Sequence, residues 1–193
     1  MNSSLELLYL IIFSGILAIG YSYLLSGQIL SASPGNDKMR EIAGAIQIGA
    51  KAYLNRQYKT IAIVGFIVLA IVTYFFNYLV GLGYFIGAFL SGVAGYVGML
   101  ISVKANVRTA EASRESLQSG LTIAFKSGAI TGLLVAGLAL LAITLYYIIL
   151  VNINADNREI INALVALGFG ASLISIFASM DTVKAVCILD LFI

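Results

Sequence analysis

Five long apolar stretches constrain this chain more than any other feature of its sequence. They cover residues 5–25, 61–80, 82–103, 127–151 and 160–178, and apart from Glu6 near the start of the first, none contains Asp, Glu, Lys or Arg. A stretch of about 20 such residues can cross a bilayer as a helix, because hydrocarbon offers exposed backbone groups no hydrogen-bond partner. With 61% hydrophobic and 10% charged residues, the chain is unlike an ordinary soluble domain. We therefore predict an all-α integral membrane protein with about five transmembrane helices.

The distribution of basic residues predicts the orientation of these helices. Cytoplasmic connections retain Lys and Arg, and here two connections hold most of them: Lys38, Arg40, Lys51, Arg56 and Lys59 in one, and Lys104, Arg108, Arg114 and Lys126 in the other. The other two connections have only Arg158. We expect a cell-membrane protein with its N-terminus outside and its C-terminus in the cytoplasm. The first stretch is longer than the apolar part of a secretory signal and has no Lys or Arg before it, which favours a retained helix.

Small residues recur every four positions within the predicted spans. Such spacing lets helix backbones approach closely, which is how helices associate in lipid. The clearest series are Gly83, Gly87, Ser91 and Gly95 in the third span and Gly128, Gly132 and Ala136 in the fourth. Weaker series are Ser14, Ala18, Ser22 and Ser26 in the first span, and Gly168 and Ser172 in the fifth. We interpret these residues as helix-packing positions.

The two basic connections themselves have helical patterns. Ser33 to Asp37 predicts a turn followed by a helix start, with Asn36 or Asp37 capping the first amide groups. Polar residues then recur every four positions from Gln47 to Lys59, so we expect one unbroken helix into the second span. Residues 104–118 have similar spacing and no proline, which predicts that the third helix continues beyond its span.

Few residues are candidates for catalysis or metal binding. The acids at the predicted inner side, Asp37, Glu41, Glu111 and Glu115, could in principle hold magnesium with a phosphate substrate. Their arginine and lysine neighbours favour weak ion pairs at solvated helix ends instead. Without His and with only Cys187, the chain is not expected to form a soft-metal site or an internal disulfide. Pumps usually carry ionisable residues at membrane depth, and the middle of each predicted span has none.

Several sequence blocks resemble the opening helices of membrane-bound, proton- or sodium-translocating inorganic pyrophosphatases. The blocks are EIAGAIQIGAKAYLNRQYKTI (41–61), FIGAFLSGVAGYVGM (85–99), VKANVRTAEAS (103–113), GLTIAFKSGAITGLLVAGLALL (120–141) and LGFGASLISIFA (167–178). The resemblance implies a homodimeric pump in the lipid bilayer that hydrolyses magnesium-complexed pyrophosphate at the cytoplasmic side and exports an ion. It implies magnesium as cofactor and no nucleic-acid partner.

The resemblance stops before the residues that carry the family's chemistry. Ser179 stands where the family has an arginine, and residues 180–193 lack its glycine run and acidic motif. We therefore expect residues 1–179 to be the first transmembrane helices of such a pump, and residues 180–193 to be a divergent tail caused by a frameshift, a truncation or a split gene. No catalytic, substrate-binding or metal-binding residue of the family can be assigned to this chain.

Three functions are consistent with these patterns. The main hypothesis is an N-terminal fragment of a pyrophosphate-energised ion pump, inactive by itself because the catalytic segments are missing. The alternative is a small non-enzymatic membrane scaffold subunit that assembles through its glycine-rich faces. A small four-helix exporter is a further alternative, and the absence of carboxylates at membrane depth argues against it.

Overall fold

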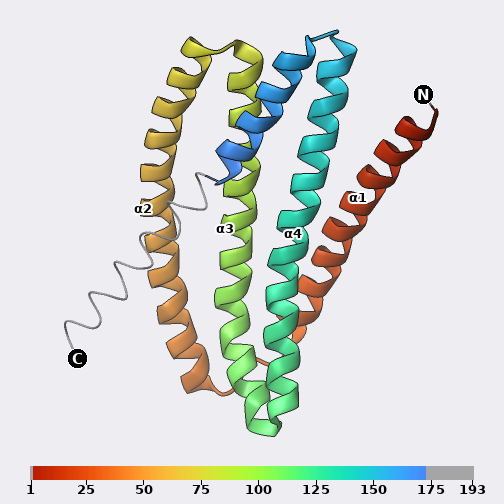
Figure 1. Cartoon of the computed structure of the whole chain (residues 1–193). Coiled ribbons are helices and arrows are strands. Elements are labelled where there is room, and N and C mark those ends of the chain that lie inside the picture. The colour runs from red at the N-terminus through yellow and green to blue at the C-terminus, as the bar shows by residue number, and fades with distance from the viewer. Residues whose placement is uncertain (1, 173–193) are drawn as a thin grey trace. The chain divides into compact units, whose positions relative to one another are not determined.

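The computed structural model describes residues 2–172, and every long element among them is a helix (Figure 1). The labelled helices are α1 (Asn2–Ser31), α2 (Asp37–Phe75), α3 (Tyr78–Glu115) and α4 (Leu117–Asn152). A further helical segment, residues 157–172, follows α4 after a short turn. This structure confirms the all-α prediction.

Four of these helices are long and apolar enough to cross a membrane. Their candidate spans lie within Glu6–Ser31, Asp37–Phe75, Tyr78–Glu115 and Leu117–Asn152. They contain the third and fourth predicted stretches, the first stretch from Glu6 onward, and most of the second. The fifth predicted stretch, 160–178, is helical as far as residue 172, and its remaining residues lie outside the described part of the chain.

Helix α2 is longer than a bilayer crossing requires. Its 39 residues extend about 58 Å at 1.5 Å per residue, against a hydrocarbon thickness of about 30 Å. The helix runs without interruption from Asp37 to Phe75, which confirms the predicted continuity from the basic connection into the second span. Asn36 caps it, because its Oδ1 accepts a hydrogen bond from the amide of Met39 at 2.9 Å.

Two predicted helix boundaries are wrong. We expected the second and third spans to separate at Gly81, but the break lies at Phe76 and Asn77. The Asn77 side chain accepts a hydrogen bond from the amide of Tyr78 at 2.7 Å, and Gly81 lies in the first turn of α3. Hydropathy cannot detect this break, because a single polar residue makes it within an apolar run.

The second wrong boundary concerns the connection after α3. Residues 104–118 were expected to be one helix, but α3 ends at Glu115 and α4 begins at Leu117. Ser116 separates them, and its hydroxyl accepts a hydrogen bond from the amide of Ser119 at 3.1 Å. A serine at this position stabilises the start of a new helix by satisfying one of its free amides.

The chain divides into two compact units, each with its own core. The first unit comprises residues 1–54 and 94–141, and Leu25, Ile29, Ala105 and Ile130 form its buried cluster. The second unit comprises residues 55–93 and, within the described part of the chain, 142–172. Its two buried clusters are Leu79, Ala142, Tyr146, Leu150, Ala163 and Leu167, and Val80, Tyr84 and Ala166.

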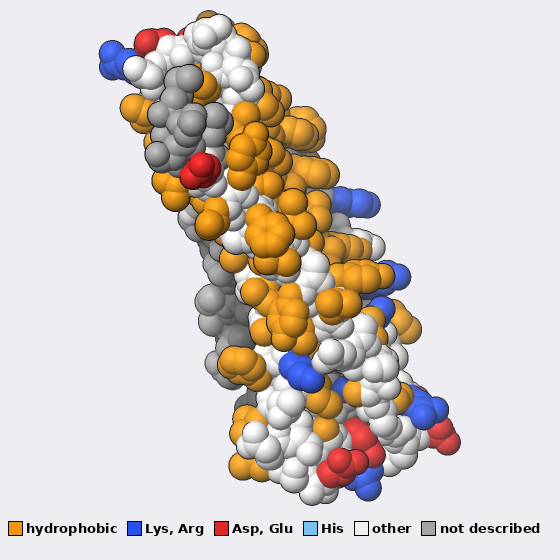
Figure 2. All heavy atoms as spheres, turned by 90° about the vertical axis from the view of Figure 1, so that its right-hand side faces the viewer, with side chains coloured by type: hydrophobic (Ala, Val, Ile, Leu, Met, Phe, Trp, Pro, Cys, Tyr) orange, Lys and Arg blue, Asp and Glu red, His pale blue; other side chains and the backbone are white. Residues whose placement is uncertain are grey.

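Large apolar side chains also cover much of the outer surface. Figure 2 shows hydrophobic side chains over much of the face turned toward the viewer. Examples are Phe13 on α1, Phe66 on α2 and Phe89 on α3, all more than half exposed. Helices that are apolar on all sides are typical of membrane spans, where lipid covers the outward face. The surface thus agrees with the composition of the helices.

Candidate functional site: a close helix-packing face

The predicted small-residue series of α3 lies against the helical segment 157–172 in the second unit. A methyl group placed on Gly83 would overlap the carbonyl oxygen of Ala163, and one placed on Gly87 would overlap that of Leu167. One turn further, the Ser91 hydroxyl donates a hydrogen bond to the Ala171 carbonyl at 3.0 Å. Both helices contribute positions four residues apart, so their backbones are in contact along three successive turns.

The facing helix contributes a glycine of its own to this contact. A methyl group on Gly170 would overlap the carbonyl oxygen of Tyr84 and lie 3.0 Å from the amide nitrogen of Ala88. Close approach therefore depends on both surfaces, because any side chain at these glycines would push the two backbones apart. The α3 packing face is our name for four positions: Gly83, Gly87 and Ser91 of α3, and Gly170 of the helical segment that faces them.

Polar contacts hold the α3 packing face near the N-terminal end of α3. The Tyr146 hydroxyl of α4 donates a hydrogen bond to the Leu79 carbonyl, and Tyr146 is almost fully buried. The Asn77 amide donates to the Glu159 carboxylate at 2.9 Å, which joins the turn before α3 to the start of segment 157–172. The first bond satisfies a buried hydroxyl group, and the second joins two partly buried side chains.

The remaining predicted packing residues have different surroundings. Gly95 is exposed. Methyl groups on Gly128 and Gly132 of α4 would meet no atom within 4 Å. The described residues thus place Gly83, Gly87 and Ser91 together, and they give Gly128 and Gly132 no close neighbour. A stabilising role for Gly83, Gly87, Ser91, Gly95, Gly128 and Gly132 stays a prediction.

Sequence reasoning missed two glycines that bring α1 and α4 close together in the first unit. A methyl group on Gly137 of α4 would lie 2.9 Å from the Gly15 carbonyl oxygen, and one on Gly15 of α1 would lie 3.2 Å from the Gly137 carbonyl. Seven residues along α1, the buried Ser22 hydroxyl donates to the Ile130 carbonyl at 3.0 Å. The predicted series of the first span included Ser22 but passed through Ser14 instead of Gly15, and a seven-residue spacing of Gly15 and Ser22 was the available signal.

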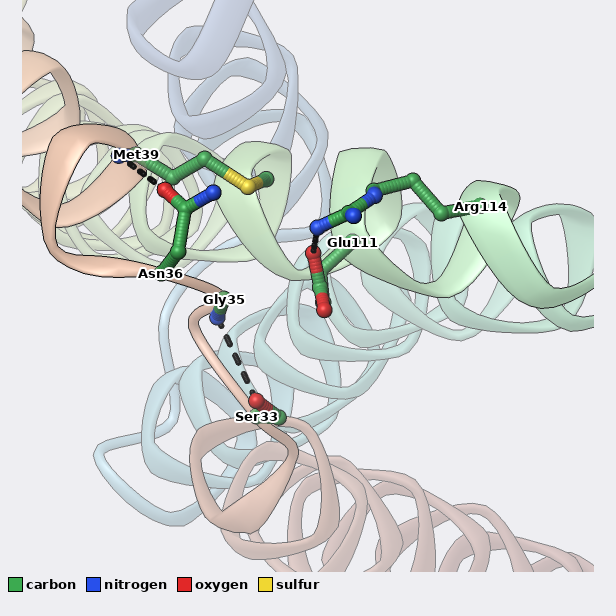
Figure 3. Close-up of polar contacts among 6 residues, drawn as sticks. All are labelled: Ser33, Gly35, Asn36, Met39, Glu111 and Arg114. Atoms are coloured by element: carbon green, nitrogen blue, oxygen red, sulfur yellow. Dashed lines mark hydrogen bonds and ion pairs between the residues drawn. The ribbon is translucent and has the colours of Figure 1, made fainter.

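In the described part of the chain, the four acids that were predicted to lie at the inner side do not converge on a metal site. Glu111 pairs with Arg114 at 3.0 Å (Figure 3). The Asp37 Oδ1 atom lies 3.8 Å from Arg40 Nη1, and both side chains are exposed. Among residues 2–172, no group of three His, Cys, Asp or Glu residues could hold a metal ion. This set of donors does not fit a magnesium–pyrophosphate complex, which requires several carboxylates facing one point. Ser179 and the divergent tail, residues 180–193, lie outside the described part of the chain.

These observations define the class of this protein. It is an all-helical integral membrane protein in which small residues bring helices into backbone contact. The family model described as inorganic H+ pyrophosphatase matches residues 16–181, which is most of the chain. The chain therefore belongs to the membrane-bound inorganic pyrophosphatase family, as its sequence blocks indicated.

Curated relatives agree with this assignment. The chain is 42% identical over 167 residues to a K(+)-insensitive pyrophosphate-energized proton pump of Methanosarcina mazei, covering 86% of this chain and 24% of the relative. It is 39% identical over 180 residues to such a proton pump of Moorella thermoacetica, with 92% and 26% covered. A putative K(+)-stimulated pyrophosphate-energized sodium pump of Bacteroides thetaiotaomicron is 38% identical over 186 residues, with 89% and 25% covered. The chain thus spans about a quarter of the length of these relatives.

Proposed function

We propose that this chain is the N-terminal part of a pump that couples pyrophosphate hydrolysis to export of protons or sodium ions. The observation that carries the proposal is the family match over residues 16–181, together with relatives named as pyrophosphate-energized pumps. In this proposal the chain acts as a helical scaffold. Its backbone-contact faces support the proposal, since closely packed helices can hold neighbouring elements in fixed positions.

The proposal assigns the chemistry to the part of the relatives that this chain does not span. Magnesium would neutralise the phosphate oxygens of pyrophosphate there, and the complete pump would be a homodimer. The inner acids support this division, because Glu111 is already paired with Arg114 and the described carboxylates do not converge. We therefore expect residues 1–193 by themselves to release no phosphate from pyrophosphate.

The proposal also includes an orientation, with the N-terminus outside and the C-terminus in the cytoplasm. Its support is the distribution of cations. The connections at residues 32–36 and 116 and the helix ends beside them carry nine basic residues: Lys38, Arg40, Lys51, Arg56, Lys59, Lys104, Arg108, Arg114 and Lys126. The connections at residues 76–77 and 153–156 have only Arg158 beside them.

A chimera tests the scaffold role. The segment of the M. mazei pump that aligns with this chain would be replaced by the matching residues of this chain, up to Ala178. At 42% identity, we expect the chimera to retain pyrophosphate-driven proton uptake in inside-out vesicles. The intact M. mazei pump is the positive control. A chimera that inserts and hydrolyses pyrophosphate normally without moving protons would contradict a passive scaffold and place part of the ion path in this segment.

The unextended chain is tested separately in reconstituted vesicles. We expect no phosphate release above empty vesicles, because pyrophosphate hydrolysis requires bound metal and cations around the leaving phosphate. Phosphate release that disappears when magnesium is chelated would contradict the proposal that the chemistry lies outside this chain. The inner acids would then be candidates for magnesium binding.

A further inference from the structure

The C-terminal end of α1 has unusual hydrogen-bond partners. A helix end leaves its last carbonyl groups without intrahelical donors. Here the Gln28 carbonyl accepts the Ser31 hydroxyl at 2.8 Å, and the Ile29 carbonyl accepts the amide of Ala32 at 3.1 Å. The usual completion by a glycine directly after the helix is absent, since Ala32, Ser33 and Pro34 follow and proline has no N–H to donate.

An arginine from another helix supplies the missing donors. Arg108 of α3 donates through Nη2 to the Leu30 carbonyl at 3.0 Å and through Nε to the Ala32 carbonyl at 3.1 Å. Its third nitrogen, Nη1, donates to the Lys104 carbonyl of its own helix at 2.7 Å. All three guanidinium nitrogens therefore bond to main-chain oxygens, and the bond within α3 fixes the direction of the side chain.

A second cation reaches the same end of α1 from α4. Lys126 donates through Nζ to the Gln28 side-chain oxygen at 3.1 Å. The last turn of α1 contains no basic residue of its own. Positive charge at a helix C-terminus is stabilising, because the exposed carbonyls carry partial negative charge. Arg108 and Lys126 thus provide from two other helices the charge that α1 lacks.

The charges around Arg108 leave it available for this role. Glu111 is the acid one turn further along α3, and its carboxylate is bound to Arg114. The nearby turn is shaped by Gly35, whose φ of +80° favours glycine, and a methyl group there would lie 3.0 Å from the Glu111 carboxylate. The Glu111 carboxylate is therefore bound to Arg114, while the Arg108 guanidinium bonds to main-chain oxygens at the end of α1 and in its own helix.

We propose that Arg108, assisted by Lys126, is a positioning residue that caps the C-terminal end of α1 in trans and holds it to α3 and α4. Much of α1 faces outward, with Leu10, Tyr23 and Leu24 more than 60% exposed. Its attachment in the first unit depends on a narrow face that includes Gly15, Ser22, Leu25 and Ile29. Loss of the charged bonds releases the last turn of α1 while the rest of the fold stays intact.

Amide hydrogen exchange of the intact chain in detergent tests this proposal. In Arg108→Gln, we expect the peptide covering residues 26–33 to exchange roughly tenfold faster, because hydrogen bonds to charged groups are worth about that factor or more. Lys126→Gln should accelerate the same peptide to a smaller extent. Arg108→Lys should be intermediate, since lysine keeps the charge but cannot donate to two carbonyls in a fixed fork.

Two controls make the outcome decisive. Lys51→Gln removes an exposed cation of the first unit that makes none of these bonds, and it should leave exchange in residues 26–33 unchanged. A peptide covering residues 152–157 in the second unit should not respond to any of these variants. Equal exchange in Arg108→Gln and Lys51→Gln would overturn the proposal. Acceleration throughout both units would also overturn it, because it would show a general loss of stability instead of a local cap.

Discussion

Single glycines control how closely these helices approach, and Gly87 is the sharpest case. A methyl group at this position would overlap the main-chain oxygen of Leu167, which cannot move without displacing its helix. We predict that Gly87→Leu lowers the free energy of unfolding in detergent by about 3 kcal/mol or more, at the upper end of overpacking effects. Thermal unfolding followed by circular dichroism measures the effect.

Gly132 offers a matched control for this substitution. It is also a helical glycine of a predicted series, but a methyl group there would meet nothing within 4 Å. Gly132→Leu should unfold within a few degrees of the parent protein. If both variants unfold at the parent temperature, the α3 packing face does not stabilise the chain, and its glycines have another role.

The hydroxyl of Ser22 provides a second test at the residue scale. It is buried in the first unit and donates to the Ile130 carbonyl of another helix. Interhelical hydrogen bonds in membrane proteins contribute about 0.6 kcal/mol on average, so Ser22→Ala should destabilise the chain by about that amount. Ser26 is the control, because its hydroxyl bonds only to the Tyr23 carbonyl of its own helix. A larger loss of stability in Ser26→Ala than in Ser22→Ala would contradict this assignment.

Local polar residues determine where the helices begin. Asn36, Asn77 and Ser116 each accept a hydrogen bond from an amide one to three residues later, and a helix starts directly after each of them. Apolar content determines that a segment is a helix, but these side chains determine its first residue. Element boundaries in this chain are therefore set by single residues.

The cap of α2 gives a prediction at the element scale. Replacing Asn36 by alanine removes the acceptor of the Met39 amide, and we expect a loss of about 1 kcal/mol. Asn36→Asp should retain the cap, since its carboxylate accepts the same bond. Denaturant unfolding in detergent measures both variants. Alanine and aspartate variants of equal stability would show that the cap contributes little to this helix.

The orientation of the whole molecule can be tested by cysteine labelling. In a Cys187→Ser background, the exposed positions Lys51 and Asn152 are replaced singly by cysteine. Asn152 is chosen over Asn154 because Asn154 has φ of +53°, a conformation that other side chains rarely adopt. On intact cells, a membrane-impermeant thiol reagent should label position 152 and leave position 51 unlabelled. Labelling of position 51 alone would show that the chain has the opposite orientation to the one proposed.

The class of this protein follows from the sequence because hydrocarbon imposes one strong condition on the chain. A run of about 20 apolar residues must satisfy its own backbone groups, so composition along the chain is enough to predict helical membrane spans. The sequence blocks that resemble the pyrophosphatase family could also be recognised without a structure. The predicted cap at Asn36 needed only local chemistry, since the capping residue and its amide are three positions apart.

Only the tertiary structure decided which small residues meet another helix. Gly87 and Gly132 have the same spacing signal, yet one faces the backbone of Leu167 and the other has no neighbour within 4 Å. The bonds from Arg108 to Leu30 and Ala32 join residues more than 70 positions apart. Periodicity within one helix identifies a face but not the partner of that face, because the partner is fixed by how separate helices pack together.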